Sequence, residues 1–209
     1  MNGAVLAHRL LNEEQIDAQR APSRGHTMSH IRKVTAIVGS TSSPSRTRVL
    51  VDAIVQSLQT TQTIEVTWVE LATLAPHIGA ATSHDALTPE GKAALQAIES
   101  ADLLIAASPV YKGSYTGLFK HLIDFLHPEA LVGKPTLLAA TGGSDRHALV
   151  VDQELRPLFS FFRTHTVPSA VFASDADFSA ITGGYQVQND ALFTRIHEAT
   201  QQASRLLAA

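Results

Sequence analysis

The stretch Val34-Thr35-Ala36-Ile37-Val38-Gly39-Ser40-Thr41-Ser42-Ser43-Pro44-Ser45-Arg46-Thr47 contains the signals that decide the fold. Its first five residues form a β-rich apolar run, which predicts a buried strand that ends at Gly39. Hydroxyl residues follow, and a helix is predicted from about Arg46, with one apolar face made by Val49, Leu50, Ala53, Ile54 and Leu58. A strand, a polar loop and a helix in this order are typical of an α/β domain.

The same alternation continues to the end of the chain. Further strands are predicted at residues 64–69, 103–107, 135–140 and 167–173. Helices are predicted from Thr88-Pro89-Glu90, where proline suits the first helical position, and over residues 115–126, 147–162 and 189–207. Pro157 is expected to kink or divide the third of these, and Pro76 and Gly79 indicate a loop. We therefore predict a doubly wound, five-stranded parallel sheet of flavodoxin-like order 2-1-3-4-5, with helices on both faces.

Composition limits the classes of function. The 209 residues suit one buried domain, and the net charge of −3 gives no basic surface for nucleic acid. No apolar run of about 18 residues is present, so no membrane span is predicted. The chain has no cysteine, which excludes disulfides, thiolate nucleophiles and cysteine-ligated metals. Any redox chemistry therefore requires a bound organic cofactor.

Residues 1–30 differ from the rest of the chain. They lack the basic start, long apolar centre and small-residue cleavage site of a secretory signal. The segment Ala21-Pro22-Ser23-Arg24-Gly25 is typical of a linker, and Met28 stands just before the first strand. We expect residues 1–30 to be a tail extraneous to the fold, residues 31–209 to form the domain, and the protein to be cytoplasmic.

Three loops follow strands that meet near one point of the predicted sheet. Ligands of open α/β sheets bind beyond the carboxyl ends of the strands, where the strand order reverses. For the order 2-1-3-4-5 that point lies between the first and third strands. The loops after Val38, Ala107 and Ala140 are therefore the candidates for a binding site.

The first loop predicts a phosphate site. It lacks both the nucleoside-triphosphate loop motif and the three-glycine dinucleotide motif. It offers hydroxyl groups from Ser40, Ser45 and Thr47, the guanidinium of Arg46 and the amides of a helix start, and it contains no acidic residue. Such donors suit a phosphate monoester. The alternative is a serine-rich turn in which Ser45 caps the helix.

The second and third loops predict two rims around the same crevice. The second contains Pro109-Val110-Tyr111-Lys112 and Tyr115, whose aromatic rings are able to pack against a flat ligand. The third reads Thr141-Gly142-Gly143-Ser144, and paired glycines let the backbone approach a ligand closely. The alternatives are ordinary packing aromatics and a plain strand-to-helix turn. Together the loops suit a mononucleotide with a large flat ring, and FMN fits better than a dinucleotide.

Other chemistries find little support. None of the ten histidines stands in a His-Glu-x-x-His motif or a close ligand pair, so no metal site is predicted. No Gly-x-Ser-x-Gly elbow follows a strand, which argues against a serine hydrolase.

In three segments the sequence resembles the NADPH-dependent FMN reductase family, and within it the flavin reductases of methanesulfonate and alkanesulfonate monooxygenase systems. The segments are Ser45-Arg46, Ser108-Pro109-Val110-Tyr111-Lys112 with Tyr115, and Ala140-Thr141-Gly142-Gly143. Residues 141–149 and 155–160 look especially like the methanesulfonate branch. The similarity extends from about residue 34 to residue 178.

The resemblance implies a flavodoxin-like homodimer or homotetramer that uses FMN with NADH or NADPH. It implies that phosphate is held by Ser40, Ser45, Arg46 and Thr47. The ring would be lined by Pro109, Val110, Tyr111 and Lys112, and its pyrimidine side contacted by Thr141, Gly142 and Gly143. It further implies a one-residue bulge in the helix after the second loop, marked by Tyr115, with a role in flavin exchange.

Hydride transfer from a nicotinamide to a flavin needs alignment within about 3–3.5 Å and exclusion of water, with no dedicated acid or base. We therefore predict no catalytic residue in the strict sense. Three functions remain open: a reductase that releases reduced FMN to a partner monooxygenase, a quinone or azo reductase that keeps its FMN, and an electron carrier. Such carriers tend to be strongly acidic, whereas the charge here is only −3.

Overall fold

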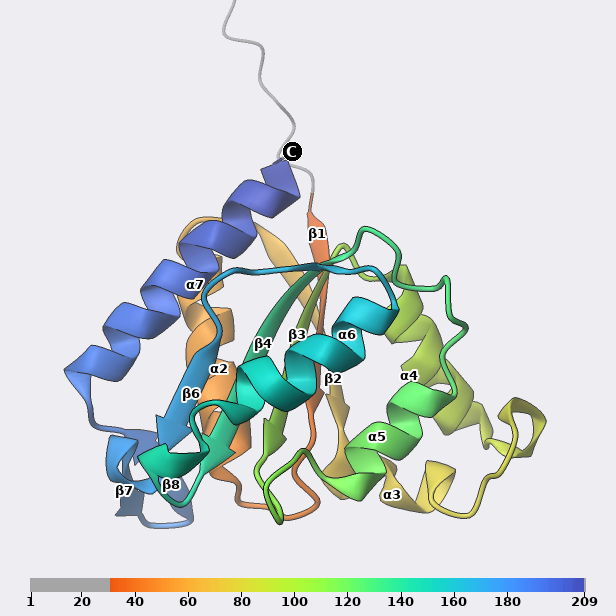
Figure 1. Cartoon of the computed structure of the whole chain (residues 1–209), viewed down its shortest axis with the longest axis horizontal. Coiled ribbons are helices and arrows are strands. Elements are labelled where there is room, and N and C mark those ends of the chain that lie inside the picture. The colour runs from red at the N-terminus through yellow and green to blue at the C-terminus, as the bar shows by residue number, and fades with distance from the viewer. Residues whose placement is uncertain (1–30, 209) are drawn as a thin grey trace, which may run out of the picture. The chain divides into compact units, whose positions relative to one another are not determined.

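A computed structural model describes residues 31–208, which form an α/β domain around a parallel sheet (Figure 1). The strands of the sheet are β1 (Arg32–Val38), β2 (Ile64–Glu70), β3 (Leu103–Pro109), β4 (Pro135–Gly142), β5 (His165–Thr166) and β6 (Val171–Ser174). The α-helices are α2 (Arg46–Gln59), α3 (Leu71–Ile78), α4 (Pro89–Ser100), α5 (Gly117–Asp124), α6 (Arg156–Phe161) and α7 (Asp190–Ala208). Residues 1–30 lie outside the described part, so their separation from the fold stays a prediction.

The predicted sheet order is confirmed. The strands run β2-β1-β3-β4-β5, all neighbours are parallel, and β6 also pairs with β4. In the middle of the sheet, Ala36 lies between Trp68 of β2 and Ile105 of β3. The order reverses between β1 and β3, which is where the predicted crevice lies.

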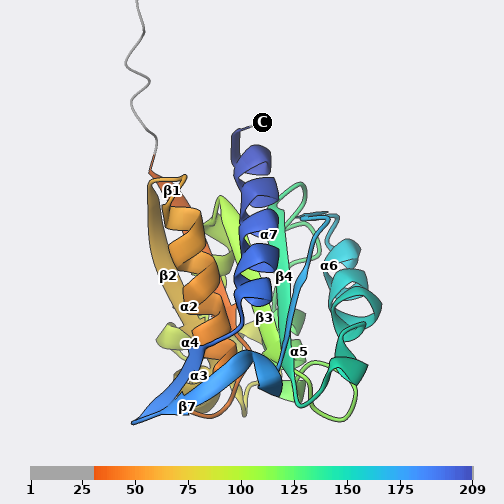
Figure 2. The ribbon, with the colours of Figure 1, turned by 90° about the vertical axis from the view of Figure 1, so that its left-hand side faces the viewer.

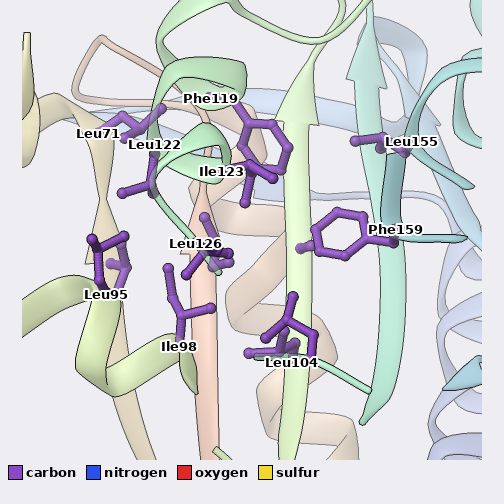
Figure 3. Close-up of a cluster of buried hydrophobic side chains, with 14 of the residues drawn as sticks. Leu71, Leu95, Ile98, Leu104, Phe119, Leu122, Ile123, Leu126, Leu155 and Phe159 are labelled. Carbon is purple, nitrogen blue, oxygen red and sulfur yellow. The ribbon is translucent and has the colours of Figure 1, made fainter. Parts of the chain in front are cut away.

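Helices cover both faces of the sheet because its strands are apolar on both sides. On one face, Ala36 and Ile105 pack beneath α2 and α7, which lie side by side in Figure 2. On the other face, Ile37 and Leu104 pack beneath α3, α4, α5 and α6. Figure 3 shows this second cluster, in which the rings of Phe119 and Phe159 lie with their centroids 6.4 Å apart. In the described range, no helix is both long and apolar enough to cross a bilayer.

The fifth strand and the helix after β4 differ from the prediction. The strand is divided, since Val167 still donates to the carbonyl of Thr136 at 2.8 Å, but Pro168 has no N–H and pairing resumes only at Val171. In place of the predicted helix 147–162, a 3₁₀ turn (Asp145–His147) comes first, and a π-helical turn (Val151–Leu155) then runs directly into α6. Pro157 stands in the first turn of α6, where its missing N–H is tolerated. Leu155 and Arg156 keep helical backbone angles, so the chain is not divided at Pro157, and only its winding changes from π to α just before that residue.

The sequence interpretation missed two elements. Helix α3 occupies the predicted loop and contains Pro76; it forms because Leu71, Leu74 and Ile78 bury one face. A hairpin of β7 (Phe178–Ile181) and β8 (Gly184–Val187) precedes α7 and lies near the carboxyl ends of the sheet strands in Figure 1.

Helix α5 is shorter than predicted. It begins at Gly117, because Thr116 caps it by accepting a hydrogen bond from the Phe119 amide at 3.2 Å. Tyr115 therefore precedes the helix, and its ring packs 6.0 Å from that of Phe119. The bulge implied for this helix is absent from α5, which is a regular α-helix. Within residues 31–208, the structure has one π-helical turn, and it lies at Val151–Leu155, after β4 and not in α5.

Candidate functional site

A pocket of about 250 Å³ opens at the carboxyl edge of the sheet, between the loops that follow β1, β3 and β4. All the predicted cofactor-binding residues except Lys112 line it, and Tyr115 is not among its lining residues. Four further residues that the prediction did not include also line it. The full lining is Ser40, Ser42, Pro44, Ser45, Arg46, Thr47, Pro109, Val110, Tyr111, Thr141, Gly142, Gly143, Asp175 and Tyr185.

The start of α2 forms the polar end of the pocket. Ser45 is extended and its hydroxyl accepts the amide of Arg48 at 3.2 Å, so the capping interpretation of this residue holds. The cap uses only one of the first-turn amides, which have no acceptors inside a helix. The amides of Arg46 and Thr47 are therefore available to a ligand, at a helix start whose dipole favours an anion.

Buried hydrogen bonds join the three loops. Thr47, in the first turn of α2 after the first loop, and Thr141, at the end of β4 before the third loop, share a hydrogen bond of 2.6 Å between their Oγ1 atoms. Thr116, at the end of the second loop, donates to the carbonyl of Gly39 at 2.9 Å. Gly39 itself has no room for a side chain, because a Cβ there would lie 2.9 Å from the carbonyl oxygen of Ala107. These contacts fix the spacing of the loops.

The second loop makes a tight turn at the rim. Tyr111 and Ser114 exchange backbone hydrogen bonds of 2.8 and 3.2 Å, and Lys112 between them has a positive φ of 54°. Lys112 thus lies at the tip of the turn. Ser114 donates to a carboxylate oxygen of Glu154 at 2.8 Å, which ties the rim to the π-helical turn. Tyr111 is 50% exposed and forms an open aromatic edge of the pocket.

Arg46 is the cation of the pocket, and two residues that sequence reasoning missed hold it. Its Nη1 lies 3.5 Å from Oδ1 of Asp175, and its Cζ lies 4.3 Å from the centre of the Tyr185 ring. Its Nε is buried without a hydrogen-bond partner. The first loop itself contains no acidic residue, but Asp175 enters the site from the end of β6.

Arg48, two residues further along, is held differently. Its Nε donates to Glu70 at 3.0 Å, it pairs with Asp52, and its guanidinium lies 3.5 Å from the ring centre of Trp68. Burial lowers the pKa of Arg48, but the bonds and charges of Glu70 and Asp52 outweigh it and raise the pKa above its ordinary value. Arg48 is therefore a structural cation, and Arg46 is the guanidinium available to a ligand.

These residues fit FMN. The orphaned Nε of Arg46, the free amides of α2 and the hydroxyls of Ser40 and Thr47 suit a phosphate. At Gly143, a Cβ would meet nothing within 4 Å, so the backbone faces open space that a ring is able to approach. Across residues 31–208 no group of three or more His, Cys, Asp or Glu side chains is placed to hold a metal ion.

A flavodoxin-like sheet with an anion site at its strand reversal and an aromatic rim defines a mononucleotide-binding α/β protein. The chain belongs to the NADPH-dependent FMN reductase family, whose sequence model matches residues 32–179. It is an oxidoreductase that uses FMN and a nicotinamide, as the resemblance implied.

Similar proteins agree with this assignment. The chain is 50% identical over 179 residues to the NADH-dependent FMN reductase SfnF of Pseudomonas fluorescens, covering 86% of this chain and 94% of that protein. It is 47% identical over 174 residues to an FMN reductase (NADPH) of Pseudomonas aeruginosa, covering 83% and 91%. A solved oxidoreductase structure from Corynebacterium diphtheriae superposes with a TM-score of 0.76 at 36% identity, covering 86% of this chain and 98% of that one.

Proposed function

We propose that this enzyme binds FMN as an exchanging substrate, reduces it, and releases the reduced flavin to a partner flavin-dependent monooxygenase. We place this pair of enzymes in sulfonate sulfur metabolism. The observation that carries the proposal is the open rim of the pocket, where Tyr111 is half exposed. An aromatic edge of this kind leaves the ring of a bound flavin accessible from solvent. The resemblance of residues 141–149 and 155–160 to the methanesulfonate branch supports the choice of partner.

Different groups of pocket residues bind different parts of FMN. Ser40, Ser45, Arg46 and Thr47 hold the phosphate, by hydroxyl and guanidinium donors and by the helix amides. Pro109, Val110 and Tyr111 lie against the ring, and Thr141, Gly142 and Gly143 present backbone to its pyrimidine side. Lys112, at the tip of its turn, contacts the ligand only if that turn closes. Tyr115 acts indirectly, through its packing under the rim on Phe119.

FMN, when bound, accepts hydride from NADH or NADPH. The chain contributes alignment and exclusion of water, and no side chain has to move a proton. The rigid spacing of the loops, set by the Thr47–Thr141 bond, serves that alignment.

Steady-state oxidation of NADH and of NADPH across an FMN titration tests the proposal. We expect turnover only when FMN is added, and loss of most flavin on dialysis. Undiminished turnover after exhaustive removal of free flavin would instead favour a quinone or azo reductase that keeps its FMN. Coupled assays with a flavin-dependent sulfonate monooxygenase then test the partner.

We also propose a cytoplasmic homodimer or homotetramer. The exposed Phe161 of α6, 66% accessible, lies beside Leu158 and Ile123 in an apolar groove, and such a surface suits contact between copies. Light scattering coupled to gel filtration measures the assembly, and a monomer at micromolar concentration would contradict it.

A further inference from the structure

The phosphate end of the pocket contains a carboxylate where a dianion is expected to bind. Among the lining residues Arg46 is the one cation and Asp175 the one anion, so the pocket has no net side-chain charge. Their side chains are 36% and 51% exposed, and they lie 3.5 Å apart. A phosphate that reaches Arg46 therefore also meets a like charge.

The fold holds Asp175 in this place. It opens a short 3₁₀ turn (Asp175–Asp177) directly after β6. The turn is fixed by Asp177, which is only 5% exposed and accepts hydrogen bonds from the Ser174 amide at 2.7 Å and from Asn189 Nδ2 at 2.5 Å. Asp177 thus carries the structural contacts, and the carboxylate of Asp175 is left to face Arg46.

Arg46 is held on its other side as well. Tyr185 of β8 places its ring over the guanidinium, and the hairpin turn lies against Pro44, since a Cβ at Gly184 would be 3.6 Å from the Cβ of Pro44. The buried Nε of Arg46 has no partner. A partly desolvated guanidinium needs an anion, and without phosphate that anion is Asp175.

We infer that Asp175 competes with the FMN phosphate for Arg46 and thereby keeps the flavin exchanging instead of resident. The inference rests on the proposed function. It makes Asp175 a specificity-determining residue, because the carboxylate reduces the contribution of the flavin phosphate to binding. Binding of FMN displaces the carboxylate from the guanidinium, and the carboxylate recaptures it as the flavin leaves. The residue lowers affinity for FMN without opposing the ring.

The variant Asp175→Asn tests this with two ligands. We expect its dissociation constant for FMN, measured by flavin fluorescence, to fall about three- to tenfold at low salt. The constant for riboflavin, which has the ring but no phosphate, is expected to stay unchanged. Stopped-flow release of FMN is expected to slow by a similar factor, and the difference between variant and wild type to shrink at high ionic strength.

Asp85→Asn is the matched control. The Asp85 side chain is fully exposed beside His84, and it lines neither the pocket nor the apolar groove. This variant makes the same change of net charge and is expected to leave both constants unchanged. Asp175→Ser repeats the test should the asparagine variant fold poorly.

Three outcomes for Asp175→Asn would overturn the inference. Weaker FMN binding would show that the carboxylate orients Arg46 for the phosphate. An unchanged dissociation constant for FMN, or an equal change in the constants for FMN and riboflavin, would show that Asp175 does not compete with the phosphate. FMN-dependent oxidation of NADH or NADPH by the wild-type protein, measured in the same preparation, tests the proposed function separately. If that activity is present but the Asp175 variants do not bind FMN more tightly, only the inference about Asp175 is wrong. If the wild-type protein binds no FMN, the proposed function and the inference are both wrong.

Discussion

The pocket has two walls that are built in opposite ways. One wall consists of the loops after β1, β3 and β4, and it is joined by buried bonds such as the 2.6 Å contact between Thr47 and Thr141. The other consists of Asp175 and Tyr185, which contact the site through a half-exposed ion pair and a ring over a guanidinium. The first wall sets where a ligand binds, and the second adjusts how firmly it is held. Arg46 lies between them.

The largest effect is expected in the first wall, at Gly39. In Gly39→Ala the new Cβ would lie 2.9 Å from both the Ala107 carbonyl oxygen and the Phe119 ring, neither of which is free to move. We expect a loss of about 2–3 kcal/mol in the free energy of unfolding, measured by urea denaturation. In the control Gly143→Ala the Cβ meets nothing within 4 Å, so stability should change by less than about 0.5 kcal/mol while FMN binds less tightly. Equal stability of the two variants would show that the first wall is not rigid.

Arg46→Ala removes the residue shared by both walls. We expect FMN binding to weaken by at least about 1.5 kcal/mol, because a charge-assisted bond is lost and Asp175 is left unpaired beside the phosphate. Riboflavin binding should change much less. Titration by flavin fluorescence measures both, and an unchanged FMN constant would place the phosphate elsewhere.

The two walls also differ in how far the sequence revealed them. Apolar strands and the strand-reversal rule were enough to locate the first wall, since each loop directly follows a strand that is buried on both faces. Asp175 was missed because it lies far from the first loop in the sequence, and only the pairing of β6 with β4 brings it to Arg46. Tyr185 was missed because the hairpin was not recognised, although Thr182-Gly183 between two β-rich runs is a turn signal and Gly183 has a φ of 84°.

The helix after β4 shows a different limit. Pro157 predicted a kink or a division, whereas the structure has a π-helical turn before it, which is bonded to a distant residue through Ser114 and Glu154. A contact between residues so far apart in the chain leaves no local pattern. Periodicity predicts where an element exists better than how its backbone is wound.

A smaller effect is expected where the first and third loops meet. In Thr47→Val the buried hydroxyl of Thr141 loses its partner, which should cost about 1–2 kcal/mol of stability. The double variant Thr47→Val with Thr141→Val leaves no orphaned hydroxyl, so it should lose less than the sum of the two single losses. Thermal and urea unfolding of the four proteins measure the coupling, and strict additivity would mean that the bond does not join the loops.

The smallest effect is expected at Tyr185, in the second wall. Tyr185→Ala removes the ring over Arg46 and should weaken FMN binding by about 0.5–1 kcal/mol, the range for a cation–π contact at an exposed site. Tyr185→Phe keeps the ring and should bind FMN like the wild type, with stability unchanged in both variants. A loss in Tyr185→Phe as large as that in Tyr185→Ala would instead assign the effect to the hydroxyl. Asp175→Asn is expected to tighten FMN binding and Tyr185→Ala to weaken it. Opposite signs from two residues that both contact Arg46 would establish the second wall as a regulator of Arg46 and not a mere boundary of the pocket.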